Sequence, residues 1–188
     1  MNNKKRQLIL SFVSFFLKSI RMMVMESCKK HEGVLNIMFR FKDIGYLTDG
    51  EIDLILEKKL PAHLEKFAAP SYHFQIKRHL MPFEIGKIDI RIGYNESTFY
   101  GGNIGYEIYP PYRGHHYAAK ACQIIRKVAQ LHGMNYLYIS CLPDNIASNK
   151  TCQLLNARAL GTYRVPFHLE MYLMGIRQIN IYDWNLVS

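Results

Sequence analysis

The stretch YRGHHYAAKAC, residues 112–122, decides how the chain is interpreted, because it joins a strand pattern to the start of a helix. Residues Tyr117–His132 carry apolar side chains at helical spacing, and Gly133 is a typical stop signal. The first N–H groups of a helix have no partner within it and lie at the positive end of its dipole. A corner that holds Arg113 and Gly114 at such an end is therefore a candidate anion site.

Upstream of this corner, three stretches alternate apolar and polar side chains with the period of a half-buried strand. They are SYHFQIK (residues 71–77), KIDIRIGY (87–94) and NIGYEIY (103–109). Turn residues separate them, around Pro82 and in YNESTFYGG (94–102), so we expect an antiparallel meander. Before the meander, LTDGEIDLILEKKL (47–60) predicts a helix, with a Thr or Asp cap ahead of apolar residues.

Downstream of the corner, the apolar run YLYIS (136–140) predicts a strand that is covered on both faces. Asp144 or Asn145 caps a second predicted helix, which ends near Leu155. Two closing strands are predicted, HLEMYLM (168–174) and RQINIYDWNL (177–186). This order of elements predicts a single α+β domain, in which helices flank a mixed, mainly antiparallel central sheet.

Composition and charge exclude several classes of protein. A chain of 188 residues with 49% hydrophobic and 21% charged residues is typical of one globular domain with a substantial core. The net charge of +9 is concentrated in residues 1–42, which carry nine basic and two acidic side chains. The remaining residues carry 15 basic and 13 acidic ones, so we expect no nucleic-acid partner for the folded body.

The cysteines and the N-terminal stretch bear on the compartment. Four cysteines lie far apart without a CxxC pair, which fits a reducing, cytoplasmic environment rather than a disulfide framework or a zinc site.

The apolar run within Lys4–Lys18 is too short to cross a membrane, which takes about 20 residues. We expect residues 1–37 to form a helical extension that packs on the domain (residues 38–188) or on a partner. Export and anchoring at a membrane surface are the alternatives.

The corner resembles the signature of the GNAT superfamily of N-acetyltransferases, Q/R-x-x-G-x-G/A at the start of a central helix. Arg113 takes the first place and Ala118 the last, and IGYEIYPPYRG matches the strand that leads into the helix. PDNIASNKTCQLLNA resembles the second signature, with Asn145 followed three residues later by Ser148. The resemblance covers roughly residues 38–186. It is greatest to the branch that contains ribosomal-protein N-terminal acetyltransferases.

The resemblance implies an acyl-CoA-dependent enzyme that moves an acetyl group from acetyl-CoA to a primary amine of a small molecule or a peptide N-terminus. The implied CoA-binding residues are Ile108, Arg113, Gly114, His115, His116, Tyr117, Ala118 and Asn145. In this assignment the N–H of Ile108 polarises the thioester carbonyl, and Asn145 holds the pantetheine amide. His116 departs from the family pattern, because it stands where the first glycine is expected and a side chain there crowds a pyrophosphate.

The acid and the base are less closely defined. The resemblance to the ribosomal-protein acetyltransferase branch implies that Ser148 is the general acid. The alternative is that the Ser148 hydroxyl only caps the helix or lies in its first turn. Cys152 stands where many members have a tyrosine and is a further candidate, with a small buried side chain as the alternative. Glu107 is the candidate base beside Ile108. Asp89 and Glu84 are candidates of similar rank, and a plain surface charge is the alternative for each.

Two other interpretations were weighed for the same residues. A metal on His115 and His116 is not expected, because adjacent helical residues point about 100° apart and seldom share an ion. A GNAT-like module that binds CoA weakly or not at all, and serves in protein interactions, is the alternative function. The expected partner is a small amine or a peptide, the expected state is a monomer or a homodimer, and residues 47–67 and 167–186 are expected to shape the acceptor pocket.

Overall fold

The structure is a computed structural model that describes residues 39–63 and 68–187, so the predicted extension of residues 1–37 lies outside the described residues. The folded unit considered below begins at Phe41. In chain order its elements are β1 (Leu47–Thr48), β2 (Ile52–Leu60), β3 (Ser71–Arg78), β4 (Glu84–Arg91), α2 (Glu96–Gly101), β5 (Ile104–Ile108), a 3-10 turn (Pro110–Tyr112), α3 (Tyr117–Leu131), β6 (Tyr136–Cys141), α4 (Ile146–Leu154), β7 (Arg158–Arg164), α5 (Glu170–Leu173) and β8 (Gln178–Asn185). Within these residues, no helix is long and apolar enough to cross a membrane.

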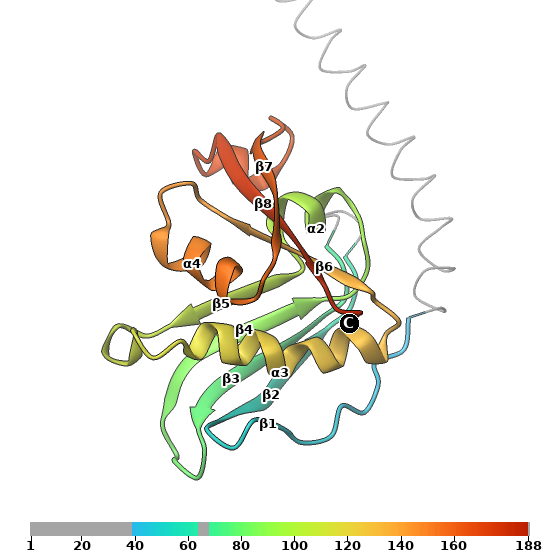
Figure 1. Cartoon of the computed structure of the whole chain (residues 1–188). Coiled ribbons are helices and arrows are strands. Elements are labelled where there is room, and N and C mark those ends of the chain that lie inside the picture. The colour runs from blue at the N-terminus through green and yellow to red at the C-terminus, as the bar shows by residue number, and fades with distance from the viewer. Residues whose placement is uncertain (1–38, 64–67, 188) are drawn as a thin grey trace, which may run out of the picture. The chain divides into compact units, whose positions relative to one another are not determined.

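The strands form two antiparallel sheets, with the orders β1-β2-β3-β4-β5 and β6-β8-β7. The sheets meet at the start of β5, where the Asn103 N–H donates to the Tyr138 carbonyl over 2.7 Å and the Asn103 side chain accepts from the Tyr138 N–H over 2.9 Å. Beyond this junction β5 and β6 diverge, and α4 lies on the side to which they open (Figure 1). The prediction of an α+β fold with a mainly antiparallel sheet flanked by helices is confirmed.

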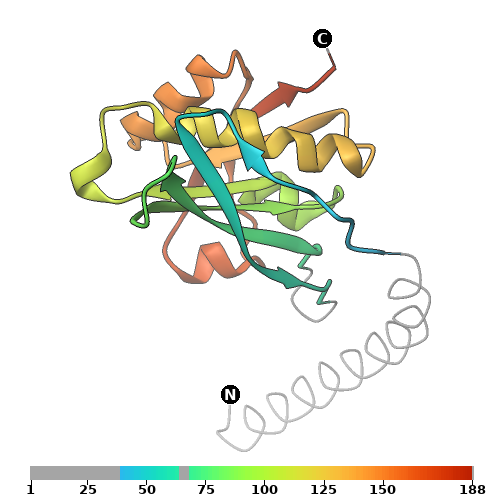
Figure 2. The same ribbon diagram turned by 90° about the horizontal axis from the view of Figure 1, so that it is seen from below.

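The core lies between α3 and the first sheet. Figure 2 shows α3 running along one side of these strands. Three residues of the predicted apolar stripe, Ala121, Ile125 and Val128, are fully buried. The sheet supplies fully buried side chains from β3 and β4, among them Tyr72, Phe74, Ile76, Ile88 and Ile90. The alternation read from the sequence therefore identifies the face of the meander that α3 covers.

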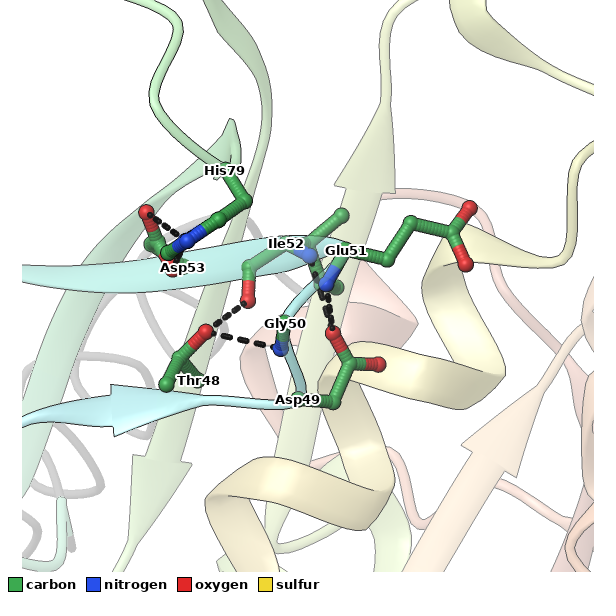
Figure 3. A network of polar contacts seen from close by, with 7 residues as sticks. All are labelled: Thr48, Asp49, Gly50, Glu51, Ile52, Asp53 and His79. Atoms are coloured by element: carbon green, nitrogen blue, oxygen red, sulfur yellow. Dashed lines mark hydrogen bonds and ion pairs between the residues drawn. The ribbon is translucent and has the colours of Figure 1, made fainter.

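The predicted helix over residues 47–60 is wrong, because this stretch forms the hairpin β1–β2 (Figure 3). The Asp49 side chain accepts hydrogen bonds from the N–H groups of Glu51 (2.9 Å) and Ile52 (2.8 Å), which builds a turn instead of a helix cap. Gly50 has a φ of 85°, a value that suits glycine and favours the turn. The expectation that residues 47–67 shape the acceptor pocket stays a prediction, now for a hairpin instead of a helix.

Three further segments differ from the sequence prediction. Residues 94–102 were expected to form a turn, but Asn95 and Thr98 form a reciprocal capping box that starts α2. The expected strand over residues 168–174 contains the short helix α5. Strand β7 was not predicted, because most of its side chains are exposed and its sequence carries no apolar alternation.

Strand β6 is present as predicted, but it is not covered on both faces. Leu137, Ile139 and Cys141 are buried, whereas the alternate side chains Tyr136, Tyr138 and Ser140 are partly exposed. The continuous apolar run thus arises because tyrosines occupy the half-exposed face. The second closing strand is confirmed as β8, which pairs with both β6 and β7.

A buried carboxylate beside the first hairpin leads to a test of the stability of this sheet. The Asp53 carboxylate lies 2.9 Å from His79 Nδ1 and is 7% exposed (Figure 3). Burial by itself raises the pKa of Asp53, but hydrogen bonds from Thr48, His79 and Tyr46 outweigh it and leave the pKa below its ordinary value of 3.8. A carboxylate with a lowered pKa stabilises the folded state at pH values above its unfolded pKa of 3.8. This stabilisation is lost as the pH falls through the lower pKa of the folded state.

We expect Asp53→Asn to lower the free energy of unfolding at pH 7 by about 1 kcal/mol, the net value of a typical hydrogen bond. The difference between variant and wild type should shrink as the pH is lowered from 5 towards 2, because the wild-type carboxylate then becomes neutral too. Urea unfolding at pH 7, 4 and 2.5 measures both effects. Asp144→Asn is the control at an exposed aspartate outside this sheet, and an equal loss of stability at every pH would contradict the assignment.

Candidate active site

The open edge of β5 is the first component of the site. Ile108 stands opposite Gly86 in the register with β4, and the next residue, Tyr109, donates its N–H to the Ile85 carbonyl over 3.0 Å. In an antiparallel pair, alternate residues bond to the same neighbour. Ile108 and Tyr106 therefore direct their backbone N–H and C=O groups away from β4, towards the opening between β5 and β6.

The corner after β5 supplies the second component. Arg113 donates its Nε–H to the Ile108 carbonyl over 2.9 Å, so its guanidinium ties the corner to the end of the strand. Gly114 has a φ of 89°, and a Cβ built there would have no atom within 4 Å. His116 precedes α3 with a left-handed φ of 58° and makes no side-chain cap. The N–H groups of Tyr117–Ala119 form the first turn and have no carbonyl partner within the helix.

Helix α4 supplies the third component. Asn145 is its N-cap, and its side-chain oxygen accepts from the Ser148 N–H over 3.1 Å, as the cap prediction requires. This bond leaves the amide NH₂ group of Asn145 to donate to a ligand. The Ser148 hydroxyl oxygen lies 2.7 Å from the Tyr106 hydroxyl oxygen, which joins α4 to β5.

These three components surround one cavity of about 540 Å³. Its lining comes from β5, the corner, the start of α3 and one side of α4: Tyr106, Glu107, Ile108, Tyr112, Arg113, Gly114, His116, Tyr117, Ala118, Asn145, Ala147, Ser148, Lys150, Thr151 and Leu154. Backbone donors at a helix start, an arginine and a lysine give this wall the chemistry of an anion site. The fold thus brings the two sequence signatures together.

Two of the predicted residues do not line the cavity. The His115 ring packs against the Tyr117 ring with centroids 5.4 Å apart. Cys152 is fully buried behind α4, so the structure gives this thiol no access to a ligand. The neighbouring Cys141 thiol and burial raise the pKa of Cys152, so it remains a neutral thiol. The catalytic prediction for Cys152 is therefore not retained.

The three candidate bases occupy different environments. Glu107 lines the cavity and is exposed, but its side chain points to the sheet face opposite that of Ile108. Burial raises the pKa of Asp89 despite the Arg91 guanidinium 3.0 Å away. Glu84 accepts a hydrogen bond from the Tyr109 hydroxyl. Of the three, Glu107 alone lies at the cavity.

Sequence reasoning missed Tyr106, which it counted as one more apolar residue of a strand. The structure places its hydroxyl at Ser148, and burial raises the pKa of this phenol well above its usual value. A tyrosine on a buried strand face needs a partner for its hydroxyl, and this requirement was the available signal.

Among the described residues, no three His, Cys, Asp or Glu side chains are grouped in a way that could hold a metal ion.

A second hollow of about 540 Å³ adjoins the loop that leads into α4. Its lining residues are Pro143, Asp144, Arg164, Val165, Tyr172, Arg177 and Gln178. The Arg177 guanidinium carbon lies 3.8 Å from the centre of the Tyr172 ring, which fixes its orientation. Asp144 lines this hollow and the next residue, Asn145, lines the first cavity, so both spaces reach the start of α4. Part of the predicted acceptor range, residues 167–186, is found here.

The left-handed conformation of His116 gives a prediction. Non-glycine residues at such a φ cost about 1–2 kcal/mol, and glycine avoids this strain at the expense of a more flexible unfolded chain. We expect His116→Gly to raise the free energy of unfolding by up to about 1 kcal/mol and to leave acetyl-CoA affinity equal or better. Denaturant unfolding and calorimetry measure the two quantities. Loss of binding in the variant would instead make the imidazole a ligand contact.

The chain belongs to the GNAT acetyltransferase family, whose domain model matches residues 37–157. No curated protein sequence matches the chain. GNAT enzymes use acetyl-CoA as the acyl donor, which agrees with the anion-binding wall of the first cavity.

Solved structures support the fold. A probable GNAT acetyltransferase from Chromobacterium violaceum aligns with a TM-score of 0.55 and 12% identity, over 79% of this chain and 91% of the other. RimL, a ribosomal L7/L12 alpha-N-protein acetyltransferase in complex with coenzyme A, aligns with a TM-score of 0.53 and 13% identity, over 74% and 97% of the two chains. The microcin C7 self-immunity acetyltransferase MccE, in complex with acetyl-CoA and AMP, aligns with a TM-score of 0.48 and 21% identity over 65% of this chain. This chain spans 63% of the length of MccE. At these identities the likeness to the first two structures shows the fold alone.

Proposed function

We propose that the protein is an N-acetyltransferase that moves an acetyl group from acetyl-CoA to a primary amine of a small molecule or a peptide N-terminus. The observation that supports the proposal is a cavity lined by Ile108 on the open edge of β5, by the start of α3 and by Ser148. Acetyl transfer from a thioester needs a donor for the carbonyl oxygen, anion contacts for the phosphates and a group that assists the leaving sulfur.

Backbone groups do most of the binding in this proposal. The N–H groups from Gly114 to Ala118 hold the pyrophosphate, since they are fixed at the helix start before any ligand arrives. Gly114 leaves open space beside them. Arg113 contributes from the edge, while its Nε–H remains on the Ile108 carbonyl. The Asn145 amide donates to the pantetheine, because its oxygen is engaged in the cap.

The reacting groups in this proposal are three residues that line the cavity. The Ile108 N–H donates to the thioester oxygen as negative charge develops there. The Ser148 hydroxyl donates a hydrogen bond to the departing sulfur. Glu107 receives a proton from the amine through water, because its side chain lies on the sheet face opposite that of Ile108. The acceptor approaches through the second hollow, whose lining includes two arginines, Arg164 and Arg177, and one carboxylate, Asp144. These charges favour an amine that carries an acidic group.

Calorimetry with acetyl-CoA and with CoA tests the donor half of the proposal. We expect binding at micromolar concentrations, and at 100 times the dissociation constant a gain of about 2.7 kcal/mol in stability, visible as a rise in Tm. A screen of amines with and without an acidic group, followed by detection of released thiol, identifies the acceptor. No heat of binding and an unchanged Tm at high micromolar acetyl-CoA would contradict the proposal that the protein is an acetyltransferase. The alternative function, a protein-interaction module, would then remain.

A further inference from the structure

A buried tyrosine is bonded to the serine that faces the cavity. The Tyr106 hydroxyl oxygen on β5 lies 2.7 Å from the Ser148 hydroxyl oxygen on α4, although the two residues are 42 positions apart in the chain. Both side chains line the cavity. The family signatures include Ser148 but not Tyr106, so the fold alone brings the pair together.

The chemistry of the two hydroxyl groups favours one direction for the hydrogen bond. The contact allows either hydroxyl to donate, and we assign Tyr106 as the donor because a phenol is more acidic than a serine hydroxyl. The neighbouring Thr151 hydroxyl donates to the Ala147 carbonyl over 3.0 Å, so its proton is already used. When Ser148 accepts from Tyr106, its own proton can be donated into the cavity, where a bound sulfur competes for it with the Cys141 thiol.

We propose that Tyr106 is a positioning residue that holds the Ser148 oxygen so that the Ser148 proton points at the sulfur of bound CoA. The proposal rests on the proposed function, because it presupposes CoA in this cavity. Each hydroxyl keeps its proton, and the pair stabilises negative charge on the sulfur by hydrogen bonding alone. Donation by Tyr106 also makes the Ser148 hydroxyl a stronger donor, as in other linked hydrogen bonds.

The surroundings of the pair are neutral at its buried end. The titratable groups that face the phenol are the thiols Cys122 from α3 and Cys152 from α4, and Cys141 from β6 faces Ser148. Burial raises the pKa of Tyr106, so the phenol keeps its proton at neutral and moderately alkaline pH. The charged and titratable side chains at the open side of the cavity are Glu107, Arg113, His116 and Lys150. They stay in place in the variants used below.

The test measures the pKa of the CoA thiol in the binary complex, which needs no acceptor. Thiolate absorbance in the ultraviolet is followed against pH, and the matching complex with desulfo-CoA is subtracted to cancel the protein thiols. We expect Ser148→Ala to raise the pKa of the bound thiol by about one unit, as for loss of one hydrogen bond to a charged group. Tyr106→Phe, which keeps the ring, should raise it by about half a unit.

The double variant and a control complete the experiment. In the Ser148→Ala background, Tyr106→Phe should add nothing, because the phenol acts through Ser148. Tyr138→Phe on β6 should leave the thiol pKa unchanged, and all variants should bind CoA with similar affinity. Should Tyr106→Phe fail to fold, an unchanged thiol pKa in Ser148→Ala would by itself overturn the proposal.

The two proposals fail in different ways. The positioning role is overturned if Tyr106→Phe leaves the pKa of the bound thiol unchanged. It is also overturned if Tyr106→Phe shifts this pKa equally in the wild-type and Ser148→Ala backgrounds. Binding of CoA with no shift in any variant overturns the positioning role and leaves the acetyl-CoA site standing. Absence of CoA binding in the wild-type protein overturns the acetyl-CoA site, and the positioning role with it.

Discussion

Ala118→Asp is expected to raise the dissociation constant for acetyl-CoA by at least about 100-fold. Ala118 lies in the first turn of α3 and lines the cavity, so an aspartate there places a negative charge against the pyrophosphate. Two like charges about 4 Å apart repel by about 4 kcal/mol near a protein surface, more than the 2.7 kcal/mol that a 100-fold loss requires.

The same substitution should leave the fold intact. An acidic residue in the first turn of a helix interacts favourably with the helix dipole, by about 0.3–1 kcal/mol. Ala118→Asn is the matched control, because it adds the same volume without the charge, and it should weaken binding far less. Calorimetry gives the affinities and thermal unfolding gives the stabilities. Equal losses of affinity in the two variants would show that crowding, and not phosphate charge, is responsible.

Gly86→Ala is expected to destabilise the folded protein by about 2–3 kcal/mol, the usual cost of overpacking a well-packed position. Gly86 is buried in β4 opposite Ile108, and a Cβ there would lie 2.2 Å from the Glu107 carbonyl oxygen. Because the atom that it meets belongs to the backbone, β5 itself must shift. The displaced strand carries the Ile108 N–H, so acetyl transfer should fall as well.

Gly101→Ala is the control for this change. Gly101 lies in α2 with no atom within 4 Å of a built Cβ and no positive φ, so the substitution should be neutral or slightly stabilising. Thermal unfolding should show a fall in Tm of about 4–12 °C for Gly86→Ala and little change for the control. Equal Tm values for Gly86→Ala and the wild type would mean that β4 and β5 are not packed as described.

The parts of the fold that could be predicted are those in which one face of an element is buried. Strands β3, β4 and β5 alternate because α3 covers one face of the meander, and α3 is followed, after its C-cap His132, by Gly133 with a φ of 74°. The prediction for residues 47–60 failed because two periods fit the same residues. Ile52, Leu54 and Ile55 suit a helix or a strand, and Asp49 can cap a helix or build a turn.

Site residues that are close together in the chain could be predicted, whereas contacts between distant residues could not. Arg113, Gly114 and Ala118 are close together in the chain, so a linear motif was enough to place them at a helix start. The contact between Tyr106 and Ser148 depends on how α4 packs against β5, and no local pattern encodes it. The left-handed φ of His116 likewise belongs to the path of the chain into α3. It gives a physical reason for glycine at that place in the family signature.

Amide hydrogen exchange followed by NMR, with and without acetyl-CoA, is the most direct test of the cleft between β5 and the two helix starts. We expect bound acetyl-CoA to slow exchange by at least about tenfold at Ile108 and at the amides from Gly114 to Ala118. Amides at the β1–β2 turn, such as Glu51, should be unaffected. Slowed exchange confined to other parts of the chain, with Ile108 and the start of α3 unchanged, would contradict the location of the acetyl-CoA site.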